Sequence, residues 1–112
     1  MKTKPLYYWA AYLSELERVA LADALGGTRV SVPEVLEPTA KLVQAIGIDA
    51  SRRLWEALGP GVIIVPLERE LRASHYRALG ESHAQIARRP GMTEKGVAKL
   101  CSRLKLRADR SK

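Results

Sequence analysis

The stretch from residue 83 to residue 102 constrains the fold of this chain more than any other part of it. Ala87 is followed four positions later by Gly91, and the apolar residues Ile86 and Met92 bracket the turn between them. A small residue lets two helices cross closely, and a glycine adopts the positive φ that a tight turn between helices requires. This spacing is typical of a helix-turn-helix. The alternative is an ordinary helical hairpin in a small α-helical domain.

The two helices of this motif carry their own start signals. Ser82 and Gln85 have the spacing of a capping box, in which each side chain bonds the backbone N–H of the other residue. Thr93 can cap the second helix, because its hydroxyl accepts from an otherwise unbonded backbone N–H. Gly80 ends a further helical stretch that precedes them. We therefore predict three helices, over 67–79, 82–89 and 93–107.

The excess positive charge of the chain lies in the same half as this motif. Residues 1–66 hold seven basic and seven acidic residues, whereas residues 67–112 hold twelve basic and five acidic ones, which accounts for the whole formal net charge of +7. A basic region that coincides with a helix-turn-helix indicates contact with phosphate. Such a motif sets its second helix into the major groove. We therefore expect residues 67–112 to form a domain that binds double-stranded DNA.

The apolar stripe of the second helix decides which of its residues can reach DNA. The residues that should face inward are Val97, Leu100, Cys101 and Leu104. Lysine side chains on the opposite face can donate to guanine, whereas cations around it meet phosphates and position the protein. The predicted base-contacting residues are Thr93, Lys95, Gly96 and Lys99. The predicted phosphate-contacting residues are Ser82, His83, Arg88, Arg89, Arg103 and Lys105.

The region 1–66 contains an internal repeat. All matched pairs of residues in its two copies are separated by the same number of positions as Leu21 and Leu54. In each copy, at about 6–33 and 39–66, a helical stretch ends at a glycine, and a short strand closed by a proline follows. The identical pairs are Leu21/Leu54, Ala24/Ala57, Leu25/Leu58, Gly26/Gly59, Val32/Val65 and Pro33/Pro66. We infer a duplicated helix–glycine turn–strand–proline unit. The expected elements are helices over 6–25, 41–46 and 50–58, with a capping-box pattern at 14–17 inside the first, and strands over 28–32 and 62–65.

A four-residue strand cannot stand alone, because its backbone N–H and C=O groups need partners. The strand 62–65 can pair with residues 30–32 of the same chain or with the equivalent strand of a second chain, and the sequence leaves both open. A single helix-turn-helix gains affinity when two copies contact two half-sites. We predict a homodimer joined through residues 1–66, with a pseudo-dimer inside one chain as the alternative. The predicted dimerisation residues are Val30, Val32, Val62, Ile63, Ile64 and Val65.

Little in the chain indicates catalysis. Its histidines are His75 and His83, and its one cysteine, Cys101, falls on the inward stripe, where a structural thiol is expected. A single cysteine excludes an intrachain disulfide and a cysteine-rich zinc site. We therefore expect that the protein is not an enzyme and that it binds no cofactor and no metal ion. No apolar run approaches the length of a membrane span, and no long apolar stretch follows the basic N-terminus as it would in a signal peptide. We therefore expect a cytoplasmic protein without a membrane partner.

Residues 42–107 resemble the Mor transcription activator family of phages. The shared features are a helix, the glycine turn Gly59-Pro60-Gly61, the strand from Val62 to Pro66, and a helix-turn-helix that contains Ala84 to Arg89. The resemblance implies a dimer with intertwined helices and strands, a DNA-binding domain at each end, and action at a promoter together with the host RNA polymerase. It also implies a phage or prophage regulator that works in the cytoplasm of a bacterial host cell.

The sequence therefore predicts a mainly α fold, with a duplicated helix–turn–short strand dimerisation region over 1–66 and a three-helix helix-turn-helix domain over 67–112. The function predicted from it is that of a sequence-specific transcriptional regulator that reads the major groove with helix 93–107. A protein-interaction adaptor is the alternative, either docking on RNA polymerase or resembling an antitoxin, with no specific DNA site. DNA binding through several phosphates weakens steeply with salt, which distinguishes the two.

Overall fold

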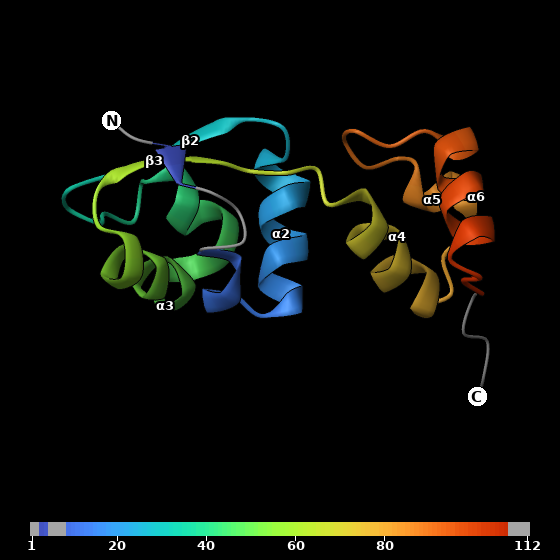
Figure 1. Ribbon diagram of the computed structural model, residues 1–112, viewed down its shortest axis with the longest axis horizontal. Helices are drawn as coiled ribbons and strands as arrows, with labels where there is room; N and C mark the ends of the chain where they lie inside the picture. The colour runs from blue at the N-terminus through green and yellow to red at the C-terminus, as the bar shows by residue number, and fades with distance from the viewer. Residues whose placement is uncertain (1–2, 5–8, 108–112) are drawn as a thin grey trace. The chain divides into compact units, whose positions relative to one another are not determined.

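The computed structural model describes residues 3–4 and 9–107 of the chain (Figure 1). It is mainly helical, as predicted, and forms two compact units, Met1–Leu67 and Glu68–Lys112. The first unit contains β1 (Thr3–Lys4), the 3₁₀ helix η1 (Ala10–Tyr12), α2 (Glu15–Leu25), β2 (Arg29–Val32), α3 (Lys41–Leu58) and β3 (Gly61–Ile64). The second unit contains α4 (Arg69–Ala78), α5 (His83–Ile86) and α6 (Glu94–Arg103).

A capping box sets the start of α2. Ser14 Oγ accepts from the backbone N–H of Glu17 at 3.1 Å, and Glu17 Oε1 accepts from the backbone N–H of Ser14 at 2.8 Å. The capping-box pattern in the sequence is therefore confirmed, and it separates α2 from η1. The other end of α2 is fixed by Gly26, where an added Cβ would lie only 2.5 Å from the carbonyl oxygen of Ala22. Only glycine allows the chain to leave the helix at this point.

Helix α3 is kinked at Gly47, whose φ of 86° and ψ of 167° are not helical. The predicted interruption at this glycine is confirmed, but the helix resumes directly after it, earlier than the sequence indicated. The segment beyond the kink covers residues 48–58. Shifting the bounds of α2 by the repeat offset gives the same range, so the two helices that precede the strands occupy equivalent places in the sequence.

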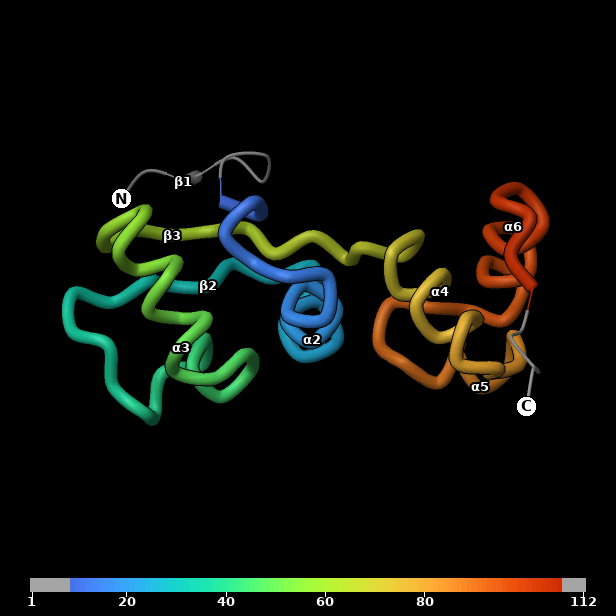
Figure 2. The backbone as a smooth tube through the Cα atoms, turned by 90° about the horizontal axis from the view of Figure 1, so that it is seen from below, coloured from blue at the N-terminus to red at the C-terminus, as the bar shows by residue number. Residues whose placement is uncertain are grey.

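The sheet places β3 between β1 and β2 (Figure 2). β2 runs antiparallel to β3, and β1 runs parallel to it. The strands of the two repeats therefore pair within one chain. Their register joins Val30 to Ile63, which are equivalent positions of the two repeats. Because antiparallel pairing of equivalent residues places a local twofold axis between them, β2 and β3 are related by an approximate twofold rotation.

Equivalent positions of the two repeats are buried together in the core of the first unit. Each member of these pairs exposes at most about 2% of its surface. The buried pairs are Trp9/Leu42, Leu21/Leu54, Val30/Ile63 and Val32/Val65. Among the aromatic residues at 7–12, Trp9 lies in this core and Tyr12 is 43% exposed. Tyr7 and Tyr8 lie outside the described residues.

The six predicted dimerisation residues do not form one surface. Val30, Val32, Ile63 and Val65 are buried inside the first unit, so a second chain cannot contact them without opening it. Val62 is half-buried, and Ile64 is exposed. Of the two pairings that the sequence left open, the structure has the one within the chain, where β2 is the partner strand of β3. Dimerisation through Val62 and Ile64 stays a prediction.

A bidentate ion pair joins α2 to the second segment of α3. The two terminal nitrogens of Arg53 donate to the two carboxylate oxygens of Glu17, one of them at 3.0 Å, and Arg53 also donates to the carbonyl of Tyr12 at 2.8 Å. The Arg53 hydrogen bonds, followed by the backbone N–H of Ser14, lower the pKa of Glu17 from 4.5 to about 2.

This pair predicts a pH dependence for the first unit. Because the pKa of Glu17 is lower in the folded state, its stabilising contribution is complete above pH 4.5 and is lost as the pH falls towards 2. Both side chains are partly exposed, so we expect only about 1 kcal/mol. Unfolding in urea, followed by Trp fluorescence, should show Glu17→Gln less stable by this amount near neutral pH, and the difference should disappear as the pH falls through about 2. A difference that does not change with pH would contradict the prediction.

Candidate nucleic-acid interface

Helices α5 and α6 of the second unit begin after the capping residues that the sequence indicated, but α5 ends at Ile86, before the predicted end at residue 89. Ser82 Oγ accepts from the N–H of Gln85 at 3.1 Å, and Gln85 Oε1 accepts from the N–H of Ser82 at 2.7 Å, which completes the capping box of α5. Thr93 Oγ1 accepts from the N–H of Gly96 at 3.0 Å and caps α6. Gly91, in the turn between the helices, has a φ of 78°. The predicted caps and the predicted glycine turn are confirmed.

Two arginines of α4 donate hydrogen bonds to the turn between α5 and α6. Arg72 donates from Nη2 to the carbonyl of Pro90 at 2.8 Å, and Arg69 donates from Nε to the carbonyl of Gly91 at 2.9 Å. Arg72 is fully buried, whereas Arg69 is exposed. Sequence reasoning missed both roles, because an arginine in a basic amphipathic helix gives no sign that its partner is a carbonyl far along the chain.

The apolar stripe of α6 faces the core of the second unit. Val97 and Cys101 are buried, as predicted, and Leu100 is half-buried. They pack with the buried residues Ala73, Ile86 and Met92. Cys101 is a free thiol that exposes only 3% of its surface, which fits the structural role expected of it.

Helix α6 ends at Arg103, before the predicted end at residue 107. The N–H of Leu106 donates to the carbonyl of Cys101 at 2.8 Å, and the N–H of Lys105 donates to the carbonyl of Ser102 at 3.2 Å. These are the two bonds of a Schellman motif, and Lys105 takes the left-handed position with a φ of 56°. The prediction of a longer helix was wrong because this position is usually filled by glycine. Leu104 therefore leaves the inward stripe and is 37% exposed.

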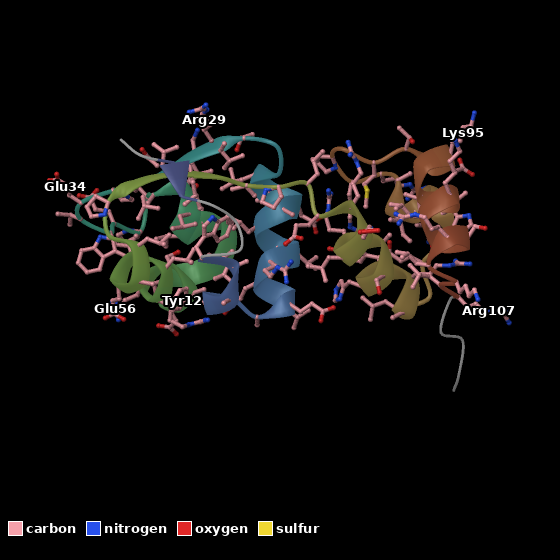
Figure 3. All side chains as sticks on the ribbon, viewed as in Figure 1. Tyr12, Arg29, Glu34, Glu56, Lys95 and Arg107 are labelled. Atoms are coloured by element: carbon pink, nitrogen blue, oxygen red, sulfur yellow. The ribbon has the colours of Figure 1, made fainter. Side chains whose placement is uncertain are left out.

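The exposed face of α6 carries two lysines near its start. Lys95 and Lys99 are both exposed, and the helical period places them opposite the buried Val97 and Cys101. Figure 3 shows Lys95 at the start of α6. The other two predicted base-contacting residues also serve the cap, since the hydroxyl of Thr93 holds the N–H of Gly96. A Cβ at residue 96 would lie 2.9 Å from that hydroxyl oxygen. Lys95 and Lys99 take no part in this cap, and their side chains are exposed.

A hollow of about 370 Å³ runs beside this face, between α4, the turn and α6. Apolar residues of the turn and of α6 line it, together with three cations. These cations are Arg69, Lys99 and Arg103. Positive side chains around a shallow hollow suit an anionic group such as a phosphate. Arg69 was not among the predicted phosphate-contacting residues, and the structure places it beside Lys99 and Arg103 in the lining of this hollow.

The predicted phosphate-contacting residues differ in accessibility. Arg88 and Lys105 are exposed. Arg103 donates to Glu70 at 2.7 Å, but both side chains are more than half exposed, and such a surface pair exchanges readily. The side-chain oxygen of Ser82 is used in its cap, and His83 is half-buried.

Arg89 is not the solvent-facing cation that the sequence predicted. Its two terminal nitrogens donate to the carboxylate of Glu81 at 2.6 and 2.9 Å, and its guanidinium lies 3.2 Å from the centre of the Tyr76 ring. The hydrogen bonds to Glu81 raise the pKa of the Arg89 guanidinium above its usual value. Arg89 therefore links Glu81, in the loop before α5, to Tyr76 of α4. Of the two neighbouring arginines Arg88 and Arg89, Arg88 is the exposed one.

No protein-family model, curated protein or solved structure matches this chain. Within residues 3–4 and 9–107, no helix is both long and apolar enough to cross a membrane. In the same residues, no three histidine, cysteine, aspartate or glutamate side chains gather in a way that suits a metal ion.

Proposed function

We propose that the second unit binds double-stranded DNA through its helix-turn-helix, with α6 in the major groove. The observation that carries the proposal is the arrangement of α6. The inward residues Val97 and Cys101 are buried, the opposite face presents the exposed Lys95 and Lys99, and Arg88 is exposed in the turn that follows α5. The excess positive charge of the chain belongs to the same unit. This combination suits lysines that read bases and arginines that contact phosphates.

We further propose that the chain is a transcriptional regulator of a phage or prophage, acting in the bacterial cytoplasm with the host RNA polymerase as a partner. The support is the resemblance of residues 42–107 to the Mor family. The matching burial of equivalent repeat positions supports an internal duplication. The homodimer stays a prediction, and any contact between chains has to use surfaces other than the four buried strand residues.

Two substitutions on the second unit should weaken DNA binding in different ways. Lys99→Ala should cost roughly 1–3 kcal/mol on a preferred site selected from random DNA and should relax the sequence preference, because it removes a donor to base edges. Arg88→Ala should weaken binding to every duplex and reduce the salt slope by about one, because it removes a phosphate contact. Binding to specific and random duplexes across a salt series measures both effects.

The matched control is Arg52→Ala, which removes an exposed cation from the first unit. It should leave affinity and salt slope unchanged. If Lys99→Ala and Arg88→Ala behave like this control, the helix-turn-helix does not bind DNA and the adaptor function replaces the proposal. Light scattering of the complex gives the number of chains per duplex.

A further inference from the structure

The outer edge of β2 is open in the part of the chain that the structure describes. β2 is an edge strand, and β3 fills its other side. The N–H of Val65 donates to the carbonyl of Thr28, and bonded and non-bonded pairs alternate along an antiparallel ladder. Val30 is therefore bonded to Ile63, whereas the backbone N–H and C=O groups of Arg29 and Ser31 point away from β3.

A groove of about 380 Å³ lies beside this edge. β2 and Pro33 form one side, and Ala40 and Lys41 at the start of α3 form the other. Two exposed cations, Arg29 and Lys41, are the charged residues among those that line it. Figure 3 shows Arg29 pointing away from the sheet. The groove therefore combines free backbone groups with positive charge.

The other edge of the same sheet shows what such an edge can hold. The approximate twofold axis between Val30 and Ile63 relates the outer edge of β2 to the outer edge of β3. The short strand β1 lies on that second edge and runs parallel to β3. An extended segment parallel to β2 would occupy the equivalent position on the first edge.

We propose that the outer edge of β2 and its groove bind an extended acidic segment of a partner protein as an added strand, parallel to β2. The outward groups of Arg29 and Ser31 supply the backbone hydrogen bonds, and the side chains of Arg29 and Lys41 attract the carboxylates. A second copy of this chain suits the edge poorly, because its own β1 contains Lys4. Nucleic acid lacks the alternating N–H and C=O groups that an edge strand pairs with.

Charge selectivity is the first test. The full chain is titrated into a short fluorescein-labelled peptide of alternating Glu and Val, and into the same peptide with Lys in place of Glu. Anisotropy should show the acidic peptide binding at least about tenfold more tightly, because the groove cations attract carboxylates. Arg29→Glu combined with Lys41→Glu should abolish this preference, and the matched control Arg52→Glu should preserve it. Equal binding of both peptides, or no binding of the acidic one, overturns the proposal.

Backbone pairing is the second test, and it separates an added strand from loose attraction between charges. In the wild-type chain, the acidic peptide should slow hydrogen exchange at the amides of Arg29 and Ser31, which face outward in the free protein. Ser31→Pro removes one outward N–H and leaves the β2–β3 bonds in place, so it should weaken the peptide at least about tenfold, while Ser31→Ala should not. Unchanged exchange at both amides overturns the proposal even if Ser31→Pro fails to fold. A DNA duplex that binds the same edge also overturns it, and DNA binding by α6 is scored separately through Lys99→Ala.

Discussion

Ile63→Asp is expected to unfold the first unit. Ile63 lies in the central strand, exposes none of its surface, and pairs with Val30 in the core. The substitution removes a buried aliphatic side chain and places a carboxyl group among apolar ones, which together cost at least about 4 kcal/mol. A unit of this size has a stability on the order of 5 kcal/mol. Trp fluorescence measures the effect, because Trp9 and Trp55 both belong to this unit.

Ile64→Asp is the matched control in the adjacent position of the same strand. Both isoleucines are among the predicted dimerisation residues, but Ile64 is 44% exposed in this chain, so its substitution should cost about 1 kcal/mol or less. The two variants change the same side chain to the same carboxylate and differ only in burial. If both are equally stable, β3 is not the central strand of a packed core. If both unfold, a surface that this chain leaves open is covered in solution.

Arg72→Met is expected to unfold most of the second unit. Arg72 is fully buried and donates to the carbonyl of Pro90 in the helix-turn-helix turn. Methionine keeps an apolar stem but cannot donate to that carbonyl. Loss of a hydrogen bond from a charged donor costs about 3 kcal/mol of stability. A unit as small as Glu68–Lys112 has little more stability than this. Hydrogen exchange at the amides of α6 should accelerate strongly, while exchange in the first unit should not change.

Arg69→Met tests the same turn from the surface. Arg69 donates to the neighbouring carbonyl of Gly91, but it is exposed, so water can replace it as a donor. The expected loss is below about 1 kcal/mol. Equal effects of the two substitutions would show that burial does not distinguish the two arginines. Faster exchange in the first unit as well would show that the turn stabilises the whole chain.

The local features of both units could be predicted from the sequence. The caps at Ser14, Ser82 and Thr93, and the glycines at the kink and the turn, act through near neighbours in the chain. A serine or threonine just before a helix can accept from the backbone N–H three residues later, and this spacing can be read from the sequence. The constant offset between the repeats was visible because it is a property of residue order alone.

The candidate interface was predicted only in part. Lys95 and Lys99 lie on the exposed face of α6 as expected, because the period of a helix places them opposite the buried Val97. The end of α6 was predicted too late, since nothing about Lys105 indicates that it takes a left-handed conformation. The partnership of Arg89 with Glu81 was also missed, because an arginine has the same appearance in a sequence whether it faces solvent or a carboxylate.

By itself, the sequence determined the capping residues of α2, α5 and α6, the places where glycines interrupt the chain, and the half that carries the excess charge. Only the tertiary structure decided that β2 pairs with β3 inside one chain and that Arg72 is buried behind the turn. The physical reason is the distance along the chain. The bond from Arg72 to Pro90 spans 18 residues, and the pairing of Val30 with Ile63 spans the whole of α3. Such partners are chosen by how whole elements pack, which no local pattern of residues encodes.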